Sequence, residues 1–251
     1  MVIKKSKLMD TNSNSKRPSI PNFLLFSDLL IPIGNVINLI KEAKTEVEKT
    51  SSAVIQKSLF SYIVSLHEIV QSDLLTIILN AFPQKLSSKP LSLEKEELLY
   101  DINQLKKRII EEHIRGLAYK NISDYMKDFF DILSIPEIGD DKLKNSLIEI
   151  KETRNLLLHN NLKMNSTYKA KAGQSKRKED YLGYLPLSED YIISSITVIV
   201  TFIDYVKKEL TKKYSHYDKY FVLKTIWNYL FQSPVLQFDD FWGKDKRWSL
   251  F

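Results

Sequence analysis

The 251-residue sequence contains no cysteine, which excludes disulfides, thiolate metal sites and cysteine nucleophiles together. This absence is compatible with a reducing environment, and we expect a cytoplasmic location. Its four histidines (His67, His113, His159 and His216) are spread singly, without the paired spacing of zinc sites, so we expect no metal and no cofactor. The sequence has no glycine-rich phosphate loop, which disfavours a nucleotide-hydrolysing motor.

Glycine and proline are scarce, and the six glycines and eight prolines leave little material for hairpin turns. Leucine, isoleucine, lysine, glutamate and serine dominate instead, and a hydrophobic content of 43% is enough to bury a core. The sequence therefore predicts an all-α fold. We expect a disordered basic tail at residues 1–21, a helical domain at 22–233, and an aromatic and basic tail at 234–251.

Hydrophobic periodicity predicts the order of the helices. Pro32 and Gly34 predict a short helix, a break, and a second helix that ends near Lys49. The apolar stretch that they interrupt is too broken and too soon charged to span a membrane, so we expect no membrane partner. Residues 51–82 form the longest apolar segment and are expected to be the central helix. Further helices are expected at 92–119, 121–133, 140–161, 188–213 and 220–231.

The end of the helix expected at 140–161 carries the arrangement that indicates chemistry. At about 100° per residue, five apolar positions lie within about 60° of Arg154, so Arg154 is expected to be partly buried. These positions are Leu143, Leu147, Ile150, Leu157 and Leu158. A buried guanidinium requires an anion or several acceptors, and phosphate is among its best geometric matches. Asn155 and His159 lie four residues apart on a neighbouring face that also carries Glu152.

A purely structural interpretation accounts for the same residues. Chance often supplies an arginine followed by a histidine at this spacing, and cations near a helix C-terminus complement the helix dipole. A structural role is also expected for three polar residues of the central helix. His67, Glu68 and Asp73 are each expected to be a hydrogen-bonded polar group in or beside the core.

Residues 154–161, Arg-Asn-Leu-Leu-Leu-His-Asn-Asn, resemble the signature of HEPN-domain proteins (higher eukaryotes and prokaryotes nucleotide-binding). In that family an arginine, a polar residue and a histidine lie near the end of a helix in an all-α bundle. Residues 164–168 and 181–191 are similar to the segments on the C-terminal side of the motif in several HEPN proteins of bacterial defence and toxin systems. The matching part covers residues 140–208. The resemblance implies a HEPN-like helical bundle with extra helical segments at both ends.

The resemblance also implies a function: metal-independent cleavage of RNA to 2′,3′-cyclic phosphate and 5′-OH ends, in antiviral defence or a toxin system. His159 would assist removal of the proton from the ribose 2′-OH, and Arg154 would hold the scissile phosphate. Asn155 would orient His159 or the phosphate. An imidazole with an ordinary pKa of about 6.5 suits acid–base work. Glu68 and Asp73 are expected partners for Arg154, because an acidic residue on an early helix can face the motif in this family.

The resemblance further implies partners. One helix offers one histidine, whereas in-line cleavage requires an acid and a base, so a homodimer with a composite active site is expected. An antitoxin or another defence-system protein is a further expected partner. Some HEPN toxins carry a tyrosine two residues after the histidine, to which nucleotides are attached. This position is Asn161 here, so that form of regulation is not expected.

Basic residues crowd the segment after the motif, and the net charge of +6 with a pI near 9.1 allows a polyanionic partner. We expect a loop that is either a solvated surface segment or a flexible arm that binds RNA phosphates. Its cations are Lys169, Lys171, Lys176, Arg177 and Lys178. Glu152 and Asn160 complete the set of expected site residues.

Two other functional interpretations stay open. The chain could be a non-catalytic helical module that binds nucleic acid or a protein through the same pocket. It could also be a helical scaffold in which Arg154 is satisfied internally by Glu68, Asp73 or a backbone carbonyl.

Overall fold

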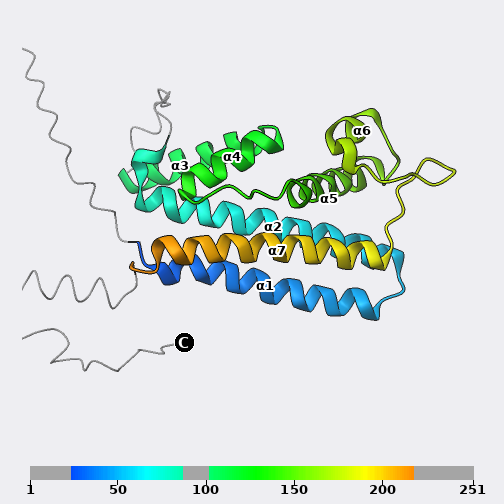
Figure 1. The fold of residues 1–251 in the computed structure, drawn as a ribbon, viewed down its shortest axis with the longest axis horizontal. Helices are drawn as coiled ribbons and strands as arrows, with labels where there is room; N and C mark the ends of the chain where they lie inside the picture. Colours follow the sequence, from blue (N-terminus) through cyan, green and yellow to red (C-terminus); the bar gives the residue numbers. More distant parts are fainter. Residues whose placement is uncertain (1–23, 87–101, 218–251) are drawn as a thin grey trace, which may run out of the picture.

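A computed structural model describes residues 24–86 and 102–217 of the chain (Figure 1). The tails expected at 1–21 and 234–251, the first turns of the helix expected at 92–119, and the helix expected at 220–231 lie outside these ranges. The described residues form helices joined by short connections, and their only β-type pairing is one isolated bridge between Lys163 and Tyr184. The predicted all-α class is confirmed for this part of the chain.

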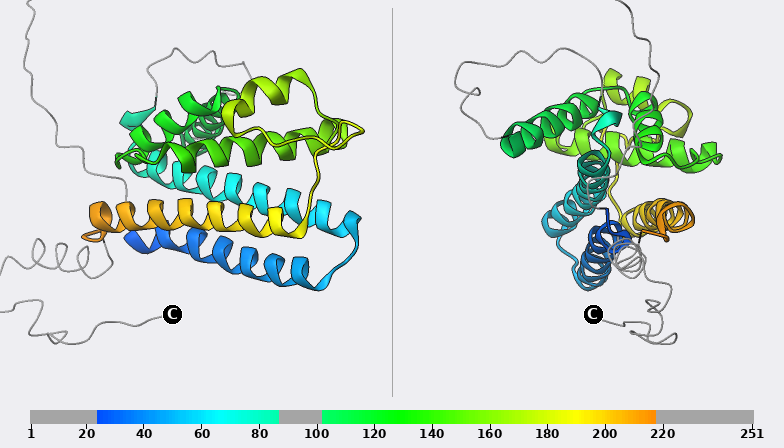
Figure 2. Two further views of the ribbon diagram at one scale, coloured as in Figure 1. Left: turned by 45° about the vertical axis from the view of Figure 1, so that its right-hand side comes forward. Right: turned by 90° about the vertical axis from the view of Figure 1, so that its left-hand side faces the viewer.

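Figures 1 and 2 both show three long helices that lie side by side, with shorter helices covering one side of them. The long helices are α1 (Phe26–Lys49), α2 (Ala53–Ala81) and α7 (Glu189–Tyr214). The covering elements are α3 (Ile102–Ala118), α4 (Ile122–Leu133), α5 (Asp141–Asn160) and α6 (Ser166–Ala172). Two short 3-10 turns, η1 (Pro83–Lys85) and η3 (Gly173–Ser175), follow α2 and α6.

α2 is the central helix, as its apolar sequence predicted. It packs against α1 and α7 in the long-helix layer and against α3, α4 and α5 in the covering layer. By length and composition alone, α2 is also apolar enough to cross a membrane, but half of its most apolar window is buried by these neighbours. Core helices commonly have this composition, because a helix that is apolar on most sides must be covered on most sides.

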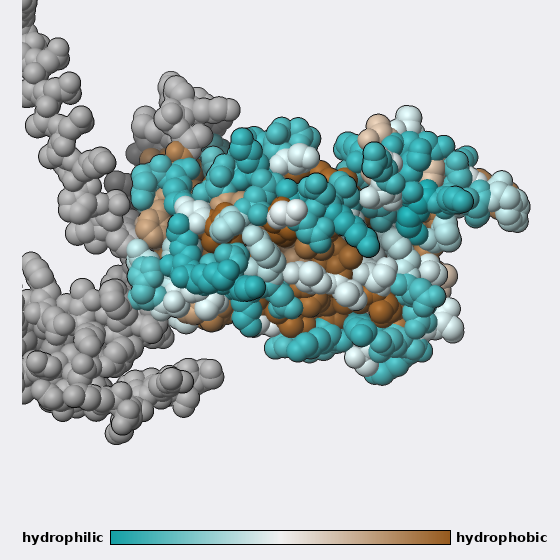
Figure 3. Space-filling model, viewed as in Figure 1, coloured by the Kyte–Doolittle hydropathy of each residue, from teal (hydrophilic) through white to brown (hydrophobic). Residues whose placement is uncertain are grey.

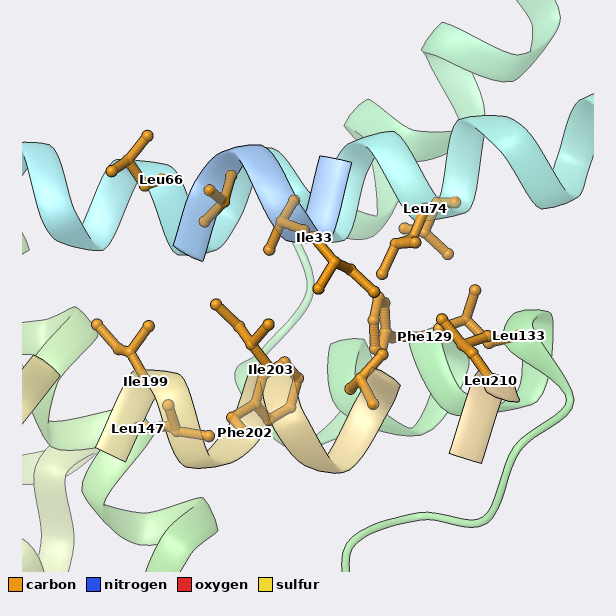
Figure 4. Close-up of a cluster of buried hydrophobic side chains, with 14 of the residues drawn as sticks. Ile33, Leu66, Leu74, Phe129, Leu133, Leu147, Ile199, Phe202, Ile203 and Leu210 are labelled. Atoms are coloured by element: carbon orange, nitrogen blue, oxygen red, sulfur yellow. The ribbon is translucent and has the colours of Figure 1, made fainter. Parts of the chain in front are cut away.

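The core is formed where α2, α4 and α7 face one another, with α1 and α5 closing its sides (Figure 4). The aromatic rings of Phe129, Phe130 and Phe202 contact each other at this centre. The buried aliphatic side chains of the same cluster include Ile33, Leu66, Leu74, Leu133, Leu147, Ile199, Ile203 and Leu210. Each large side chain buried in this way contributes about 1.5–3 kcal/mol to stability.

α1 runs without interruption through Pro32, so the break expected at Pro32 and Gly34 is wrong. A proline inside a helix costs about 3 kcal/mol, because it removes one backbone hydrogen bond and crowds the preceding turn. The apolar stripe of α1 continues across this position at helical spacing and offsets that cost. Its buried residues are Leu29, Ile33, Val36, Ile40, Ala43 and Val47. Packing therefore overrides local helix propensity here.

The predicted helix starts at 121, 140 and 188 are confirmed by side-chain caps. Asn121 Oδ1 accepts a hydrogen bond from the Asp124 amide at 2.9 Å. Asp140 Oδ1 accepts from the amides of residues 142 and 143 at 2.9 and 3.2 Å. Ser188 Oγ accepts from the Tyr191 amide at 3.2 Å. Each bond satisfies a donor that the first turn leaves free, and the Asp140 cap fixes where the motif helix begins.

The segment after α5 is folded, and the loop expected there is wrong for residues 166–175, which form α6 and η3, whereas residues 176–188 form no helix. Asn165 caps α6 through a 2.8 Å hydrogen bond from the Tyr168 amide, and the Tyr168 side chain is buried. A second, smaller core forms beneath this segment from Leu156, Leu162, Tyr168, Ala172 and Leu185. Of the extended piece expected at 182–187, the Tyr184 bridge and the 2.9 Å bond from the Leu185 amide to the Leu162 carbonyl are observed.

His67 of α2 lies between the core and the covering layer. Its ring makes an edge contact with Phe202, with 4.9 Å between ring centroids, and the Gln71 amide nitrogen lies 2.7 Å from His67 Nε2. Burial, and to a smaller extent the charge of Lys151, lowers the pKa of His67 to about 3. The imidazole is therefore neutral at physiological pH, as expected of a hydrogen-bonded polar group beside the core.

His67 should make the fold sensitive to acid. Below pH 6.5 the unfolded chain protonates this imidazole while the folded chain does not, so stability falls as the pH drops toward 3. We expect this effect to cost up to about 2 kcal/mol between pH 6.5 and 5, at about 1.4 kcal/mol per pH unit. Urea unfolding at both pH values should show a smaller decrease for His67→Gln than for the wild type. Equal decreases would contradict the prediction.

Candidate active site

A cavity of about 1240 Å³ opens between the two parts of the covering layer, α3 with α4 and α5 with α6. α2 forms its floor, the α3–α4 turn forms one wall, and α5 with α6 forms the other. Figure 3 shows one face of the molecule, on which hydrophobic side chains reach the surface between the hydrophilic parts of the covering layer. Arg154, Asn155 and His159 all line the cavity, as do Glu68 and Glu152. Among the described residues, no three His, Asp or Glu side chains gather as metal ligands.

Arg154 is held where α5 packs on α2. Its side chain is 21% exposed, which confirms the predicted partial burial. Nη2 donates to Glu68 Oε2 at 3.2 Å and to Ser65 Oγ at 3.4 Å, and Nη1 donates to Asn155 Oδ1 at 3.2 Å. Nε is buried without a hydrogen-bond partner. Three side chains thus orient the guanidinium, and one of its donors is left without an acceptor.

Glu68 serves two cations. Its Oε1 lies 3.6 Å from Lys151 Nζ, and its Oε2 pairs with Arg154. Lys151 also lies over the Tyr125 ring, 5.6 Å from the centroid. One carboxylate between two cations leaves an excess of positive charge, so the cavity retains electrostatic capacity for an anion. Asp73, the other expected partner, is exposed and does not reach Arg154, because five residues carry it about 140° around α2 from Glu68.

His159 is exposed on the last turn of α5. Its side chain makes no hydrogen bond or ion pair with any residue in the described ranges. Asn155, one turn earlier, was expected to orient His159 or the phosphate, and the contact that its Oδ1 makes is with Arg154. The imidazole is therefore free to meet a ligand, while the amide helps to position the guanidinium.

The chain reverses directly after His159. Asn160 Nδ2 donates to the Lys163 carbonyl at 2.6 Å, so this expected site residue closes the turn. Asn161 and Leu162 follow with φ of 46° and 67°, in the left-handed region. Asparagine adopts this conformation readily, whereas for a leucine it costs about 1–2 kcal/mol. Burial of the Leu162 side chain in the second core offsets that cost.

A buried carboxylate that the sequence did not reveal holds the opposite side of α5. Glu149 is 5% exposed and accepts four hydrogen bonds. The donors are Thr153 Oγ1 at 2.6 Å, Tyr168 OH at 2.7 Å, Arg177 Nε at 2.9 Å and Tyr191 OH at 2.8 Å. Burial raises the pKa of both tyrosine hydroxyls, so both stay protonated and donate. A helical glutamate resembles a surface residue in sequence, and three of its donors lie 19 to 42 residues away.

The five cations that were expected to bind substrate fall into two groups: three form ion pairs with carboxylates, and two form none with the described residues. Arg177 pairs with Glu149 and lies 3.5 Å from the Tyr191 ring centroid, so it is part of the folded framework. Lys169 pairs with Glu179 at 3.1 Å, and Lys171 pairs with the buried Glu152 at 3.6 Å. Lys176 and Lys178 are exposed and make no ion pair with any described residue. These two lysines are the members of the set best placed to meet a polyanion.

Glu149→Gln should destabilise the protein by roughly 3 kcal/mol, because removing one charge from a buried pair strands Arg177 in a poorly solvated site. Glu48→Gln provides a matched control, since Glu48 is half exposed and pairs with Lys44 at 3.7 Å. That change should cost less than about 1 kcal/mol. Urea unfolding of both variants measures the difference, and equal small losses would contradict a structural role for Glu149.

Comparisons of the chain with protein-family models, with curated proteins and with solved structures found no match. The activity of this site must therefore be inferred from its residues and their arrangement.

Proposed function

We propose that this protein is a metal-independent endoribonuclease of the HEPN type, built on a HEPN-like bundle, which cleaves RNA to 2′,3′-cyclic phosphate and 5′-OH ends. One observation carries the proposal: an oriented arginine and an unpaired, exposed histidine line the same cavity at the same end of α5. Resemblance of residues 154–161 to the HEPN signature supports the same conclusion.

The proposed reaction is in-line displacement within the RNA. His159 accepts the proton of the ribose 2′-OH, and the 2′ oxygen attacks the adjacent phosphorus. The bond to the 5′ oxygen breaks, and this oxygen takes a proton from a general acid. Arg154 stabilises the charge that develops on the phosphorane oxygens. Glu68 and Asn155 act as positioning residues, because they hold the guanidinium in place before RNA binds.

A homodimer with a composite site supplies the missing acid. His67 also lines the cavity, but with a pKa of about 3 it does not carry a proton at neutral pH. Each chain then contributes one free imidazole, that of His159, while the reaction requires both a base and an acid. We therefore propose that two copies pair so that their His159 side chains flank one phosphate.

The proposed setting is the bacterial cytoplasm, in antiviral defence or a toxin system, where uncontrolled RNA cleavage stops growth. An antitoxin or another defence-system protein would restrain the activity. The net charge of +6 suits an RNA substrate.

A second candidate function is a non-catalytic module that binds nucleic acid or a protein. The Glu68–Arg154 pair favours it, because an internal carboxylate already occupies one guanidinium nitrogen. The two functions differ in whether bound RNA survives.

Cleavage should depend on His159. Purified wild-type protein, incubated with end-labelled RNA in excess EDTA, should release fragments that end in 2′,3′-cyclic phosphate. His159→Ala should lower the rate by about 10²–10⁴, the usual contribution of general acid–base catalysis. His113→Ala, which changes a histidine of α3 outside the cavity lining, should cleave like the wild type. Undiminished cleavage by His159→Ala would exclude the proposed role, and RNA left intact by the wild type would favour the binding module.

Arg154 and Glu68 should separate binding from catalysis. Arg154→Ala should abolish cleavage and also lower stability, because Glu68 keeps only Lys151 as a partner. Glu68→Gln should retain the fold and lower KM, since less negative charge opposes the phosphate. The same variant should lower kcat about tenfold or more, because the guanidinium is less well oriented. A Glu68→Gln variant with unchanged kcat would show that Glu68 does not position Arg154.

A further inference from the structure

Carboxylates form ion pairs with several of the cations around α5. Glu68 pairs with Arg154 and Lys151, and Glu152 pairs with Lys171. Glu149 pairs with Arg177, and Glu179 pairs with Lys169. Lys57 of α2 differs from all of these. Its Nζ donates to the neutral Asn161 Oδ1 at 3.2 Å, and it pairs with no carboxylate among the described residues. Its full charge is therefore available to an anion at the C-terminal end of α5.

Two contacts fix the position of Lys57 relative to the candidate active site. Glu68 meets Arg154, and Lys57 meets Asn161, so α2 and α5 run antiparallel across this seam. Lys57 and Glu68 are eleven residues apart, or within about 20° on one face of α2, so both face α5. Asn161 lies two residues beyond His159 in a left-handed conformation. Lys57 is thus held beside the end of the motif helix, half-buried and oriented.

We propose that Lys57 binds a second RNA phosphate, next to the phosphate held by Arg154; this inference rests on the proposed ribonuclease activity. Arg154 and Asn161 are seven residues apart, about 10 Å along the helix axis, so one phosphate cannot contact both positions. A single strand that joins the two positions follows the side of α5 that faces α2, about 140° around the helix from His159. Lys57 then fixes the direction in which the strand runs from Arg154 along α5.

Leu158 supports this path. It lies one turn after Arg154 and one turn before Asn161, and it is 54% exposed, although its position in the apolar stripe predicted burial. An exposed apolar side chain between two phosphate ligands offers a contact for a ribose or a base.

The test uses the full chain and a labelled 2′-O-methyl RNA oligonucleotide, which cannot be cleaved. Lys57→Gln should weaken binding about fivefold at low salt and reduce the slope of log affinity against log salt by about 0.7, the share of one phosphate contact on a single strand. Lys212→Gln removes the same charge from an exposed lysine paired with Glu209 at the far end of α7 and should bind like the wild type. Lys57→Arg should restore most of the affinity.

Cleavage kinetics provide an independent readout. Lys57→Gln should raise KM for RNA about fivefold and change kcat less than twofold, because Lys57 contacts a phosphate that does not react. Equal affinity of Lys57→Gln and Lys212→Gln, or no binding by the wild type, would overturn the inference. Binding to 2′-O-methyl RNA that depends on Lys57, with no cleavage of ordinary RNA, would support the second phosphate contact while refuting the ribonuclease.

Discussion

The candidate site depends on one ion pair, between Arg154 of α5 and Glu68 of α2, which are 86 residues apart in the chain. This pair sets the register of the motif helix on the central helix. Glu149 holds the opposite side of α5 through Arg177 and two tyrosines. With charged contacts on both sides, α5 is fixed along most of its length, and His159 extends from its last turn as an unpaired group. A rigid helix with a free imidazole at its end is the central feature of this structure.

Local signals predicted much of this arrangement. The caps at Asn121, Asp140 and Ser188, the long apolar helix α2 and the partial burial of Arg154 follow from short-range chemistry, and all are observed. The break expected at Pro32 is wrong, because the packing of α1 outweighs a single unfavourable residue. The loop expected after the motif is wrong for residues 166–175, because burial of Tyr168 and Leu162 folds a segment that looks polar and mobile in sequence.

Composition and periodicity could not predict most pairings between distant residues. The sequence shows how many lysines follow the motif, but not that Glu152 and Glu179 neutralise two of them. Glu149 and Lys57 were missed because their importance comes from partners far along the chain. Glu68 was named as a partner for Arg154 by family resemblance and is found there. Which charged residues form ion pairs depends on how the helices pack, whereas the number of charged residues follows from composition alone.

The floor of the cavity belongs to the same helix that organises the core. The α2 floor and the α3–α4 wall of the cavity therefore differ in how freely their residues can be substituted. Substitutions at Ser65 or Glu68 alter a helix that every large neighbour packs against, so changes in recognition there cost stability. The α3–α4 turn, with the exposed Tyr119, faces the same cavity from the edge of the fold. Relatives that act on different ligands should therefore vary along this turn and retain the α2 surface beneath it.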